Sequence, residues 1–378
     1  MTPWLIVAGD LTPLGGMDAA NHALARWLAA RGEVHLVAHR VWPDLASQPR
    51  VRVYQVRRPF GRHALGAPLL ARGGQRVWEH LVSTGAHAVV NGGNCAIGDA
   101  NWVHYLHAAY DPPPTGGIVS RVVAARTRRR DLADERRALR IARLVICNSR
   151  RTRDDVVERV GIDPDRTRVI YYGSDPERFA PPTGAEREAA RQALDVPASR
   201  MLAGFVGALG DRRKAFDTVF EAWTRLCRRS DWDVDLVVAG SGRELPVWRA
   251  RARDAGLAGR IRFLGFRTDV PRILAALDVF VHPARYEAYG LSVHEALCRG
   301  VPALVSVAAG VAERYPPGLH DLLIDDPDDA GELVTRLDAW RSKQRAMAAA
   351  AGQFAPALLA RTWDTMAAEI VAAVESAA

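Results

Sequence analysis

The sequence predicts an α/β fold of two doubly wound domains, each with a parallel sheet covered by helices on both faces. Its 378 residues exceed what one hydrophobic core usually needs and suit two domains. Short apolar, β-rich runs alternate with helical stretches, a pattern typical of parallel sheets. The alternation restarts after residues 173–200, which are rich in Pro, Gly and charge and predict a linker.

The predicted strands are the short apolar runs of each half. Those of the first half are residues 3–9, 33–39, 51–56, 86–93, 101–107, 144–149 and 168–173. Those of the second half are residues 201–209, 233–242, 260–266, 279–284, 302–307 and 321–325. We expect a first domain over residues 1–176, a second over 177–352, and a helical tail over 353–378 that packs back on the first domain.

Composition excludes several classes of protein. With 48% hydrophobic and 25% charged residues, the chain is typical of soluble globular proteins, and it has no apolar run near the roughly 18 residues of a membrane span. The first residues lack the basic region of a secretory signal. Four well-separated cysteines argue against a metal site or disulfide framework and favour a reducing cytosol.

The formal net charge of +8 predicts an anionic partner such as a nucleotide, a phosphate or a membrane surface. Of the 51 Lys and Arg residues, only Lys214 and Lys343 are lysines, so each deserves examination. Ligands of open α/β sheets bind beyond the carboxyl ends of the strands, so the loops after each predicted strand are the places to search.

The segment 284–302, "ARYEAYGLSVHEALCRGVP", carries two glutamates at such a place. Glu287 falls in a loop after a strand, and Glu295 about one turn into a helix that Gly300 closes. Amides around Gly290 and Leu291 at the helix start would bind an anion. A capping box over Ser292–Glu295 explains Glu295 without a ligand, but it does not explain Glu287. Carboxylates on both sides of an anion site suit a nucleotide-sugar.

A second candidate is the loop "GALGDRRKAFD", which follows the first strand of the second half. Arg212, Arg213 and Lys214 offer compact positive charge to a pyrophosphate. The alternative is a solvated basic loop in an arginine-rich protein. A lysine kept where nearly every other basic residue is arginine favours a function.

Two glycine-containing loops remain. Gly15 and Gly16 follow the first strand and precede a helix, where they either let the backbone approach a ligand or form a flexible turn. "AGSGREL", which begins at Ala239, starts like a dinucleotide fingerprint, but Leu245 stands where the third glycine belongs, so we discount it.

The run "WVHYLHAAYDP" contains His104 and His107, whose spacing on a strand disfavours joint metal binding. A lone histidine is usually structural. His107 nevertheless lies at the carboxyl end of the strand, where a ligand-binding residue belongs. Further along, residues 121–145 carry nine arginines and three acids, which is a solvated helix face or a helix that lies on a membrane surface.

These segments, taken in order over nearly the whole chain, resemble glycosyltransferase family 4. The stretch around Glu287 and Glu295 is similar to the E-x7-E region of that family. The other matching segments are "PLGGMDAANHALARWLAARG", "VHYLHAAYDP", "LVICNSRRTRDDV", "RVIYYGSDPERF", "FVGALGDRRKAFDTVFEAW", "VVAGSGRE", "IRFLGFRTDV" and "DDPDDAGELV". The resemblance implies the GT-B fold, two Rossmann-like domains facing across a cleft, and retaining glycosyl transfer.

The resemblance also implies roles for residues. It places His107 beside the donor sugar and Glu287 on the sugar hydroxyls as the catalytic pair. The donor-binding residues it implies are Gly15, Gly16, Arg213, Lys214, Phe266, Tyr289, Gly290, Leu291 and Glu295. Lys214 would hold the diphosphate and Glu295 the ribose, with backbone near Phe266 beside the base. Where the family often has an arginine after the loop's first glycine, this chain has Ala208, so Arg212 or Arg213 would supply the second cation.

The function we expect is therefore transfer of a sugar from a UDP- or GDP-linked donor to a hydroxyl acceptor, without a cofactor or metal. The acceptor is a glycan, a lipid-linked compound or a small molecule, and nucleic acid is not expected. We expect the cytoplasm, with peripheral contact to the inner face of the membrane left open. The alternatives are another GT-B enzyme, such as a sugar-nucleotide epimerase or a phosphorylase-like protein with pyridoxal phosphate on Lys343, and a non-catalytic nucleotide-binding protein.

Overall fold

The computed structural model describes residues 2–113, 116–197 and 199–377, which form two compact units. Unit 1 comprises Met1–Gly173 and Thr362–Ala378, and unit 2 comprises Ser174–Arg361. The chain passes from unit 1 to unit 2 after Gly173 and returns to unit 1 at Thr362. The expected domain boundaries, 176/177 and 352/353, are near these two crossings. Gly173 is required at the crossing, because a Cβ there would lie 2.4 Å from the main chain of Thr362.

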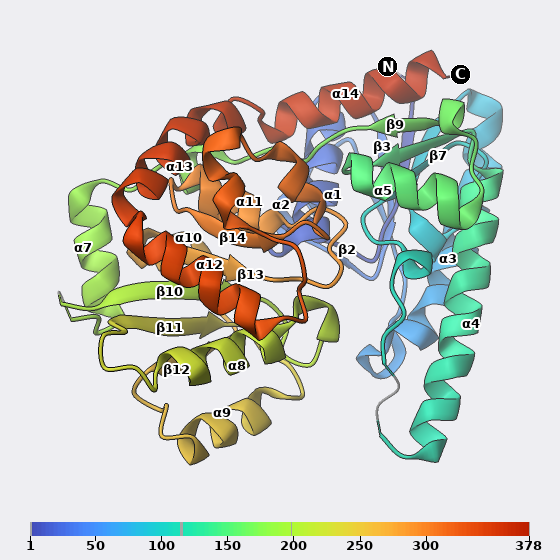
Figure 1. Cartoon of the computed structure of the whole chain (residues 1–378). Coiled ribbons are helices and arrows are strands. Elements are labelled where there is room, and N and C mark those ends of the chain that lie inside the picture. Colours follow the sequence, from blue (N-terminus) through green and yellow to red (C-terminus); the bar gives the residue numbers. More distant parts are fainter. Residues whose placement is uncertain (1, 114–115, 198, 378) are drawn as a thin grey trace. The chain divides into compact units, whose positions relative to one another are not determined.

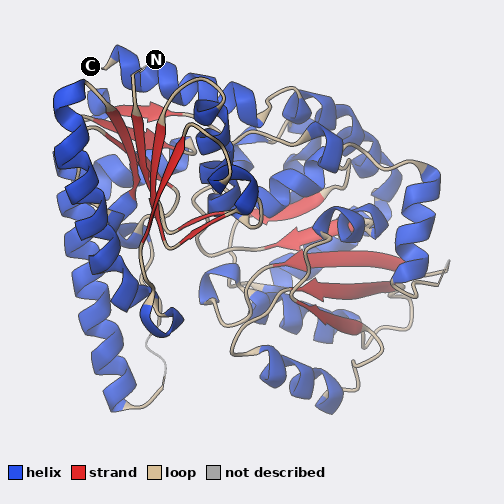
Figure 2. Ribbon diagram, turned by 180° about the vertical axis from the view of Figure 1, so that it is seen from behind, coloured by secondary structure: helices blue, strands red, loops and turns tan. Residues whose placement is uncertain are grey.

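Unit 1 is built on a parallel sheet (Figure 2). Its strand order is β5-β3-β1-β6-β7-β8-β9. Its strands are β1 (Trp4–Val7), β3 (Val34–Ala38), β5 (Val51–Gln55), β6 (His87–Asn91), β7 (Ala100–Val103), β8 (Leu144–Cys147) and β9 (Thr167–Val169). Each predicted run of the first half therefore overlaps a strand, although most runs are longer than the strand. Two short strands, β2 (Asp10–Leu11) and β4 (Arg40–Val41), pair separately.

The helices of unit 1 cover both faces of this sheet (Figures 1 and 2). They are α1 (Gly16–Ala29), α2 (Pro43–Ala46), α3 (His63–Leu81), α4 (Ile118–Ile141), α5 (Arg150–Asp155), which continues as a π-turn (Val156–Val160), and α14 (Trp363–Ser376). The terminal helix α14 packs against α1. The helix before it, α13 (Gln344–Leu359), belongs to unit 2, so only the last part of the predicted tail packs on unit 1.

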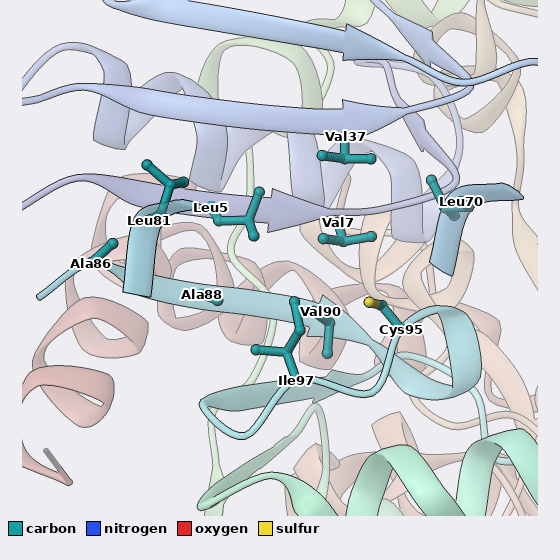
Figure 3. Packing of buried hydrophobic residues seen from close by; sticks show 10 residues of the cluster. All are labelled: Leu5, Val7, Val37, Leu70, Leu81, Ala86, Ala88, Val90, Cys95 and Ile97. Carbon is teal, nitrogen blue, oxygen red and sulfur yellow. The ribbon is translucent and has the colours of Figure 1, made fainter. Parts of the chain in front are cut away.

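The core of unit 1 lies between α3 and the middle strands (Figure 3). Its buried side chains are Leu5, Val7, Val37, Leu70, Leu81, Ala86, Ala88, Val90, Cys95 and Ile97. Burial of one Leu or Val side chain stabilises a protein by about 1.5–3 kcal/mol. Gly74 lets α3 approach this closely, because a Cβ there would lie 2.9 Å from both Val7 and Cys95.

Unit 2 repeats the parallel arrangement with the strand order β12-β11-β10-β13-β14-β15. The strands are β10 (Met201–Val206), β11 (Val234–Ala239), β12 (Ile261–Gly265), β13 (Val279–His282), β14 (Ala303–Ser306) and β15 (Leu323–Ile324). The helices are α6 (Pro176–Phe179), α7 (Gly184–Ala193), α8 (Phe216–Leu226), α9 (Leu245–Asp254), α10 (Val270–Ala276), α11 (Leu291–Cys298), α12 (Ala330–Ser342) and α13. The prediction of two doubly wound α/β domains is confirmed.

The prediction of a linker over residues 173–200 was wrong for most of that segment. Helices α6 and α7 lie there, and α7 packs against α10 within unit 2. Thr183 and Glu186 form a capping box at the start of α7, with each side chain bonded to the main chain of the other residue. The sequence Thr183-x-x-Glu186 was a readable start signal, but the surrounding Pro and Gly obscured it.

The glycines of "AGSGREL" have a structural role that explains why this segment is not a dinucleotide fingerprint. At Gly242, with φ at 150°, a Cβ would lie 1.8 Å from the carbonyl oxygen of Leu209, and at Gly240 a Cβ would lie 1.8 Å from that of Gly207. The loop after β11 thus packs directly on the main chain of the loop after β10, and Leu209 N donates to Ser241 O at 2.9 Å. These contacts fix the basic loop from one side.

Candidate functional site

The candidate site of unit 2 lies at the carboxyl edge of its sheet, between β10 and β13. These strands are neighbours, yet the chain leaves β10 for β11 on one side and returns to β13 on the other. Such a topological switch point opens a crevice at the carboxyl ends of the strands, where α/β proteins bind ligands. The loops that follow β10 and β13 carry the two motifs singled out in the sequence.

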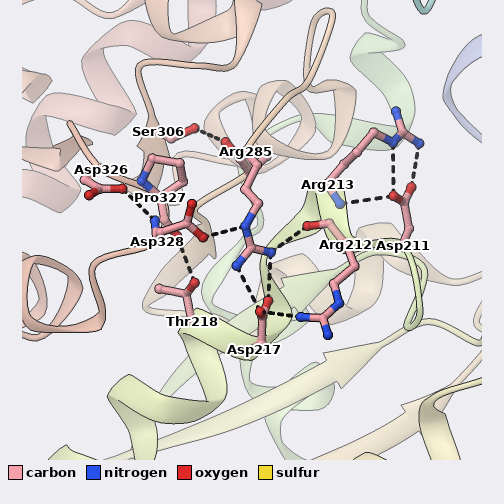
Figure 4. A network of polar contacts seen from close by, with 11 residues as sticks. Asp211, Arg212, Arg213, Asp217, Thr218, Arg285, Ser306, Asp326, Pro327 and Asp328 are labelled. Atoms are coloured by element: carbon pink, nitrogen blue, oxygen red, sulfur yellow. Dashed lines mark hydrogen bonds and ion pairs between the residues drawn. The ribbon is translucent and has the colours of Figure 1, made fainter. Parts of the chain in front are cut away.

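The basic loop after β10 is held by a network of ion pairs (Figure 4). Asp211 caps the 3-10 turn Arg212–Lys214 by accepting from Arg213 N, and it also binds the Arg213 guanidinium. Arg212 pairs with Asp217 at 3.0 Å. The two arginines suggested as the second cationic contact are therefore already matched to carboxylates.

Arg285 joins this loop to the loop after β13 (Figure 4). Its guanidinium binds Asp217 at 2.9 Å and Asp328 at 2.6 Å, and it donates to the carbonyl of Arg212 at 2.7 Å. Its own amide donates to the carbonyl of Arg213 at 2.7 Å. Although burial disfavours the Asp217 carboxylate, Arg285 holds the pKa of that carboxyl below its usual value.

Lys214 and Glu287 form an ion pair between the two loops. Their side chains are only 18% and 17% exposed, so water screens the pair little. His282, the last residue of β13, places Nε2 3.5 Å from the same carboxylate oxygen. Burial would raise the pKa of Glu287, but Lys214 and His282 outweigh it and hold that pKa far below its ordinary range. The structure thus brings together Lys214 and Glu287, which the sequence identified separately.

Main-chain contacts set the position of Glu287 and of the helix behind it. Gly310 N donates to the carbonyl of Glu287 at 3.0 Å, and Val311 N to that of Tyr289 at 2.7 Å. The Tyr289 ring is buried, and its hydroxyl lies 2.9 Å from Nδ1 of the buried His294. Tyr289 therefore presents only its main chain to a ligand, while its ring anchors the loop.

Gly290 starts α11 with φ at 108°, a conformation that only glycine adopts readily. The next two amides, of Leu291 and Ser292, have no acceptor within the part of the chain that the structure describes. They are two of the unpaired N–H groups that make a helix start attractive to anions. The sequence predicted an anion site at Gly290 and Leu291, and the backbone geometry is suited to it.

Glu295 lies one turn further along α11 and differs sharply from Glu287. Ser292 is inside the helix, since Gly290 is its N-cap, and no side chain caps α11. The capping-box interpretation of Glu295 is therefore wrong. The Glu295 carboxyl has no hydrogen-bond partner among the described residues, and burial, only partly offset by Arg178, raises its pKa to about 8. A half-buried carboxyl without a partner is available to a ligand.

The other predicted residues have the following surroundings. Phe266, directly after β12 at the same edge of the sheet, is 69% exposed. In unit 1, Gly15 is the N-cap of α1 with φ at 89°, and Gly16 is its first residue; both are exposed. Lys343 pairs with Asp321 at an exposed position, which is unsuitable for pyridoxal phosphate.

His107 begins a 3-10 turn (His107–Ala109) beyond β7 in unit 1. The Glu135 carboxylate accepts from the amides of His107 and Ala108, at 2.6 and 3.0 Å, and so fixes this turn. Burial raises the pKa of Glu135 to about 7, although the two amides oppose the rise. His104, by contrast, is buried against Tyr172, and burial lowers its pKa to about 3.

Sequence reasoning missed His282, Arg285 and Glu135. His282 lies between Phe205 and Phe280, and its Nδ1 has no partner among the described residues. Its signal was a polar residue at the end of an apolar strand. Glu135 gave no comparable signal, because it is one of three acids within an arginine-rich helix.

Within the described residues, no group of three or more His, Cys, Asp or Glu side chains is arranged to hold a metal ion. The four cysteines are free thiols. None of the described helices is both long and apolar enough to span a membrane.

Comparison with known proteins assigns the chain to a class and then to a family. It is similar to the crystal structure of WaaG, a glycosyltransferase of lipopolysaccharide biosynthesis, with a TM-score of 0.80, 22% identity and coverage of 98% and 99% of the two chains. It also resembles Anabaena HepE in complex with UDP and glucose, with a TM-score of 0.72, 21% identity and full coverage of both chains. The fold is thus that of the GT-B class.

The family models match both units. The model of Glycosyltransferase Family 4 matches residues 14–178, and that of Glycosyl transferases group 1 matches residues 200–340. The chain is 32% identical over 189 residues to the lipopolysaccharide core biosynthesis mannosyltransferase LpsB of Rhizobium meliloti strain 1021, covering 48% of this chain and 52% of that protein. It spans about half the length of the first curated relatives that it matches. The chain belongs to glycosyltransferase family 4.

The raised pKa of Glu295 makes the stability of unit 2 depend on pH. Between its ordinary value of 4.5 and about 8, the unfolded chain ionises Glu295 while the folded protein keeps it protonated. The contribution of protonated Glu295 to folding stability is therefore complete below about pH 4.5, and it is lost as the pH rises from there through about 8. We expect the free energy of unfolding of Glu295→Gln, relative to wild type, to increase by roughly 2–4 kcal/mol from pH 5 to pH 8. Hydrogen exchange of β13 amides measures it.

Glu188→Gln is the matched control, since Glu188 is an exposed glutamate of α7 in the same unit. Its difference from wild type should be the same at both pH values. A pH-independent difference for Glu295→Gln as well would contradict the raised pKa.

Proposed function

We propose that the chain is a retaining, metal-independent hexosyltransferase that moves a sugar from a nucleoside-diphosphate sugar to a hydroxyl acceptor. The observation that carries this proposal is the meeting of Lys214, Glu287 and the start of α11 at the switch point of unit 2. A cation, free helix amides and carboxylates at one edge of a sheet match the diphosphate and hydroxyl groups of such a donor.

Each group then has a role along the donor. Lys214 and the amides of Leu291 and Ser292 bind the diphosphate, and Glu295 binds the ribose hydroxyls. Glu287 binds the hydroxyls of the sugar. The exposed Phe266 and its backbone border the base. In unit 1, we propose that His107 and the start of α1 at Gly15 and Gly16 contribute to the reaction, and that the same unit binds the acceptor.

The pairing of Lys214 with Glu287 suggests how the donor prepares the site. When the diphosphate draws Lys214 away, the Glu287 carboxylate loses its cation and becomes free for the sugar hydroxyls. As the glycosyl bond breaks, positive charge develops at the anomeric carbon and negative charge on the diphosphate. Lys214 and the helix amides stabilise the leaving group by preorganised electrostatics. The acceptor hydroxyl attacks from the leaving-group side and forms the new glycosidic bond with retained configuration, while its proton passes to the oxygen of the departing diphosphate.

For the nucleotide, we propose a UDP- or GDP-linked donor, with UDP as the first to test. The support is that HepE was solved with UDP and glucose, while LpsB is named a mannosyltransferase. Shifts in melting temperature with UDP, GDP, ADP and dTDP rank the bases, since a ligand at 100 times its Kd adds about 2.7 kcal/mol of stability.

Calorimetry on three variants separates the donor contacts. The ligands are uridine, UDP and UDP-glucose, or the guanosine series if GDP ranks first. Lys214→Ala should leave the affinity for the nucleoside unchanged and lower the affinity for the diphosphate by roughly tenfold or more. Glu295→Gln should weaken all three ligands. Glu287→Gln should leave uridine and UDP unweakened, because it releases Lys214 from its partner, and should lower turnover of the donor.

Lys343→Ala is the matched control, because Lys343 is the chain's other lysine and lies at the end of α12. It should bind all three ligands as wild type does. Equal losses of uridine and UDP affinity in Lys214→Ala would refute the diphosphate role. Weaker binding of bare UDP in Glu287→Gln would refute the division between the two glutamates.

Metal independence rests on the cationic groups of the site itself. Lys214 and two free amides neutralise charge that a divalent cation would otherwise screen. We expect the initial rate of transfer to be unchanged, within about twofold, after incubation with EDTA. Loss of activity that manganese restores would show that the diphosphate needs a metal.

We further propose that the enzyme works in the cytoplasm and contacts the membrane through the start of α4. Ile118 and Val119 are each 79% exposed, and Val122 and Val123 continue the same apolar stripe at 46% and 58%. Residues 118–130 include five arginines and no acid. An apolar stripe flanked by arginine suits an anionic lipid surface.

Co-sedimentation with phosphatidylcholine vesicles, with and without phosphatidylglycerol, measures this contact. The wild type should bind only the anionic vesicles, and a double Ile118→Ser, Val119→Ser change should weaken binding by roughly tenfold or more. Val247→Ser, at a 54% exposed position of α9, is the matched control. Wild-type binding by the double variant would exclude this face of α4.

A further inference from the structure

The carboxyl edge of the unit 1 sheet contains a cavity that the donor-site residues do not line. It lies where β3 and β5 end, has a volume of about 700 Å³ and is lined in part by His39, Gln55, Arg57, Arg58 and Phe60. All of these residues belong to unit 1, and they lie at or just after the carboxyl ends of parallel strands, the edge where α/β sheets bind ligands.

Positive charge predominates around this cavity. The segment 57–63, "RRPFGRH", holds three arginines and no acid. Arg58 pairs with Asp10 at 2.7 Å, and Arg40 pairs with the same carboxylate at 3.1 Å, so one acid serves two arginines. Arg57 has no ion pair or hydrogen bond from its guanidinium within the described residues, and it is exposed.

His39, His63 and Asp18 also face this cluster. His39 is buried and places Nδ1 3.0 Å from the carbonyl of Val56, so this nitrogen donates its proton there. Asp18 lies within electrostatic range of Asp10, Arg40 and Arg58, and burial, with Asp10, raises its pKa to about 6. With both acids ionised, Arg40, Arg57, Arg58 and Arg62 still leave an excess of positive charge.

Phe60 adds an apolar surface beside these cations. Its side chain is 93% exposed, and its φ of 52° is a left-handed conformation that a non-glycine residue rarely adopts. The turn is held by Gly61 N donating to Arg58 O and Arg62 N donating to Pro59 O, both at 3.0 Å. A strained, exposed aromatic residue in a fixed turn is typical of a binding position.

We propose that this cavity binds the acceptor and that the acceptor carries a phosphate. Arg57 and Arg58 bind the phosphate oxygens, and the Phe60 ring packs against the ring or chain that bears the accepting hydroxyl. Arginine is the residue best matched to phosphate, because its planar donors engage two oxygens together. A soluble sugar phosphate and a lipid-linked phosphate share this chemistry. The inference rests on the proposed function and narrows its acceptor class.

Titration with inorganic phosphate tests the site directly, in protein saturated with UDP so that the donor site is filled. Wild type should give a saturable signal by calorimetry, and Arg57→Gln should weaken it by roughly tenfold. Arg253→Gln, which removes the same charge from the exposed face of α9 in unit 2, should bind phosphate as wild type does. Equal phosphate affinity in wild type and Arg57→Gln overturns the proposal.

Phe60→Ala separates the two parts of the site. It should retain the affinity for inorganic phosphate and lose several-fold in affinity for glucose 6-phosphate, and glucose itself should bind to neither protein. Saturable binding of glucose 6-phosphate that depends on Arg57 indicates a soluble acceptor. Arg57-dependent binding only to phosphatidylcholine vesicles that contain phosphatidic acid indicates a lipid-linked one. Absence of an Arg57-dependent response to either phosphate overturns the proposal.

Different measurements test the proposed function and the phosphate-bearing acceptor. The affinity for UDP, measured on the same variants before UDP is added to saturation, should depend on Lys214 and not on Arg57. Failure of the wild type to bind either UDP or GDP would contradict the proposed function. Intact UDP binding, with transfer to neutral acceptors that Arg57→Gln leaves unchanged, would contradict the phosphate-bearing acceptor alone.

Discussion

The ion pair between Lys214 and Glu287 is the interaction on which the candidate site of unit 2 depends. It joins the loops after two neighbouring parallel strands, β10 and β13, in a place that water reaches poorly. Removing one partner of a buried pair costs about 3–5 kcal/mol, because the other charge stays behind without its water. A ligand that takes Lys214 must therefore satisfy Glu287 as well. A diphosphate joined to a sugar offers groups for both.

The residues around the pair hold its two loops in place through contacts that do not involve the Lys214 ammonium or the Glu287 carboxylate. Arg285 ties the two loops together through the carboxylates of Asp217 and Asp328 and the carbonyl of Arg212, none of which belongs to the pair. Gly242 lets the loop after β11 pack on the carbonyl of Leu209. Gly290 starts α11 in a backbone conformation that residues with a side chain rarely adopt. Because rigid neighbours position the loops, Lys214 and the free amides of α11 are left for binding.

Much of the fold followed from the sequence, because hydrophobic alternation and chain length are local or additive properties. Each predicted run overlapped a strand, and the restart of the pattern marked the second unit. The segment 173–200 was misjudged because Pro and Gly were given more weight than the capping box at Thr183 and Glu186. At the site, Lys214, Gly290 and the two glutamates were recognisable by residue type and position. His282, Arg285 and Glu135 were not, because their importance lies in contacts with distant residues.

The sequence by itself determined which chemical groups follow each strand and in what order they occur. Only the tertiary structure decided which of them meet. Lys214 and Glu287 are 73 positions apart, and they pair because the order of strands places β13 beside β10. The same packing gives different surroundings to two glutamates that look alike in the sequence. Glu287 faces a lysine that keeps it ionised, whereas Glu295 has no cation in contact and burial keeps it protonated. Charge state depends on desolvation and on the nearest opposite charge, and the fold sets both.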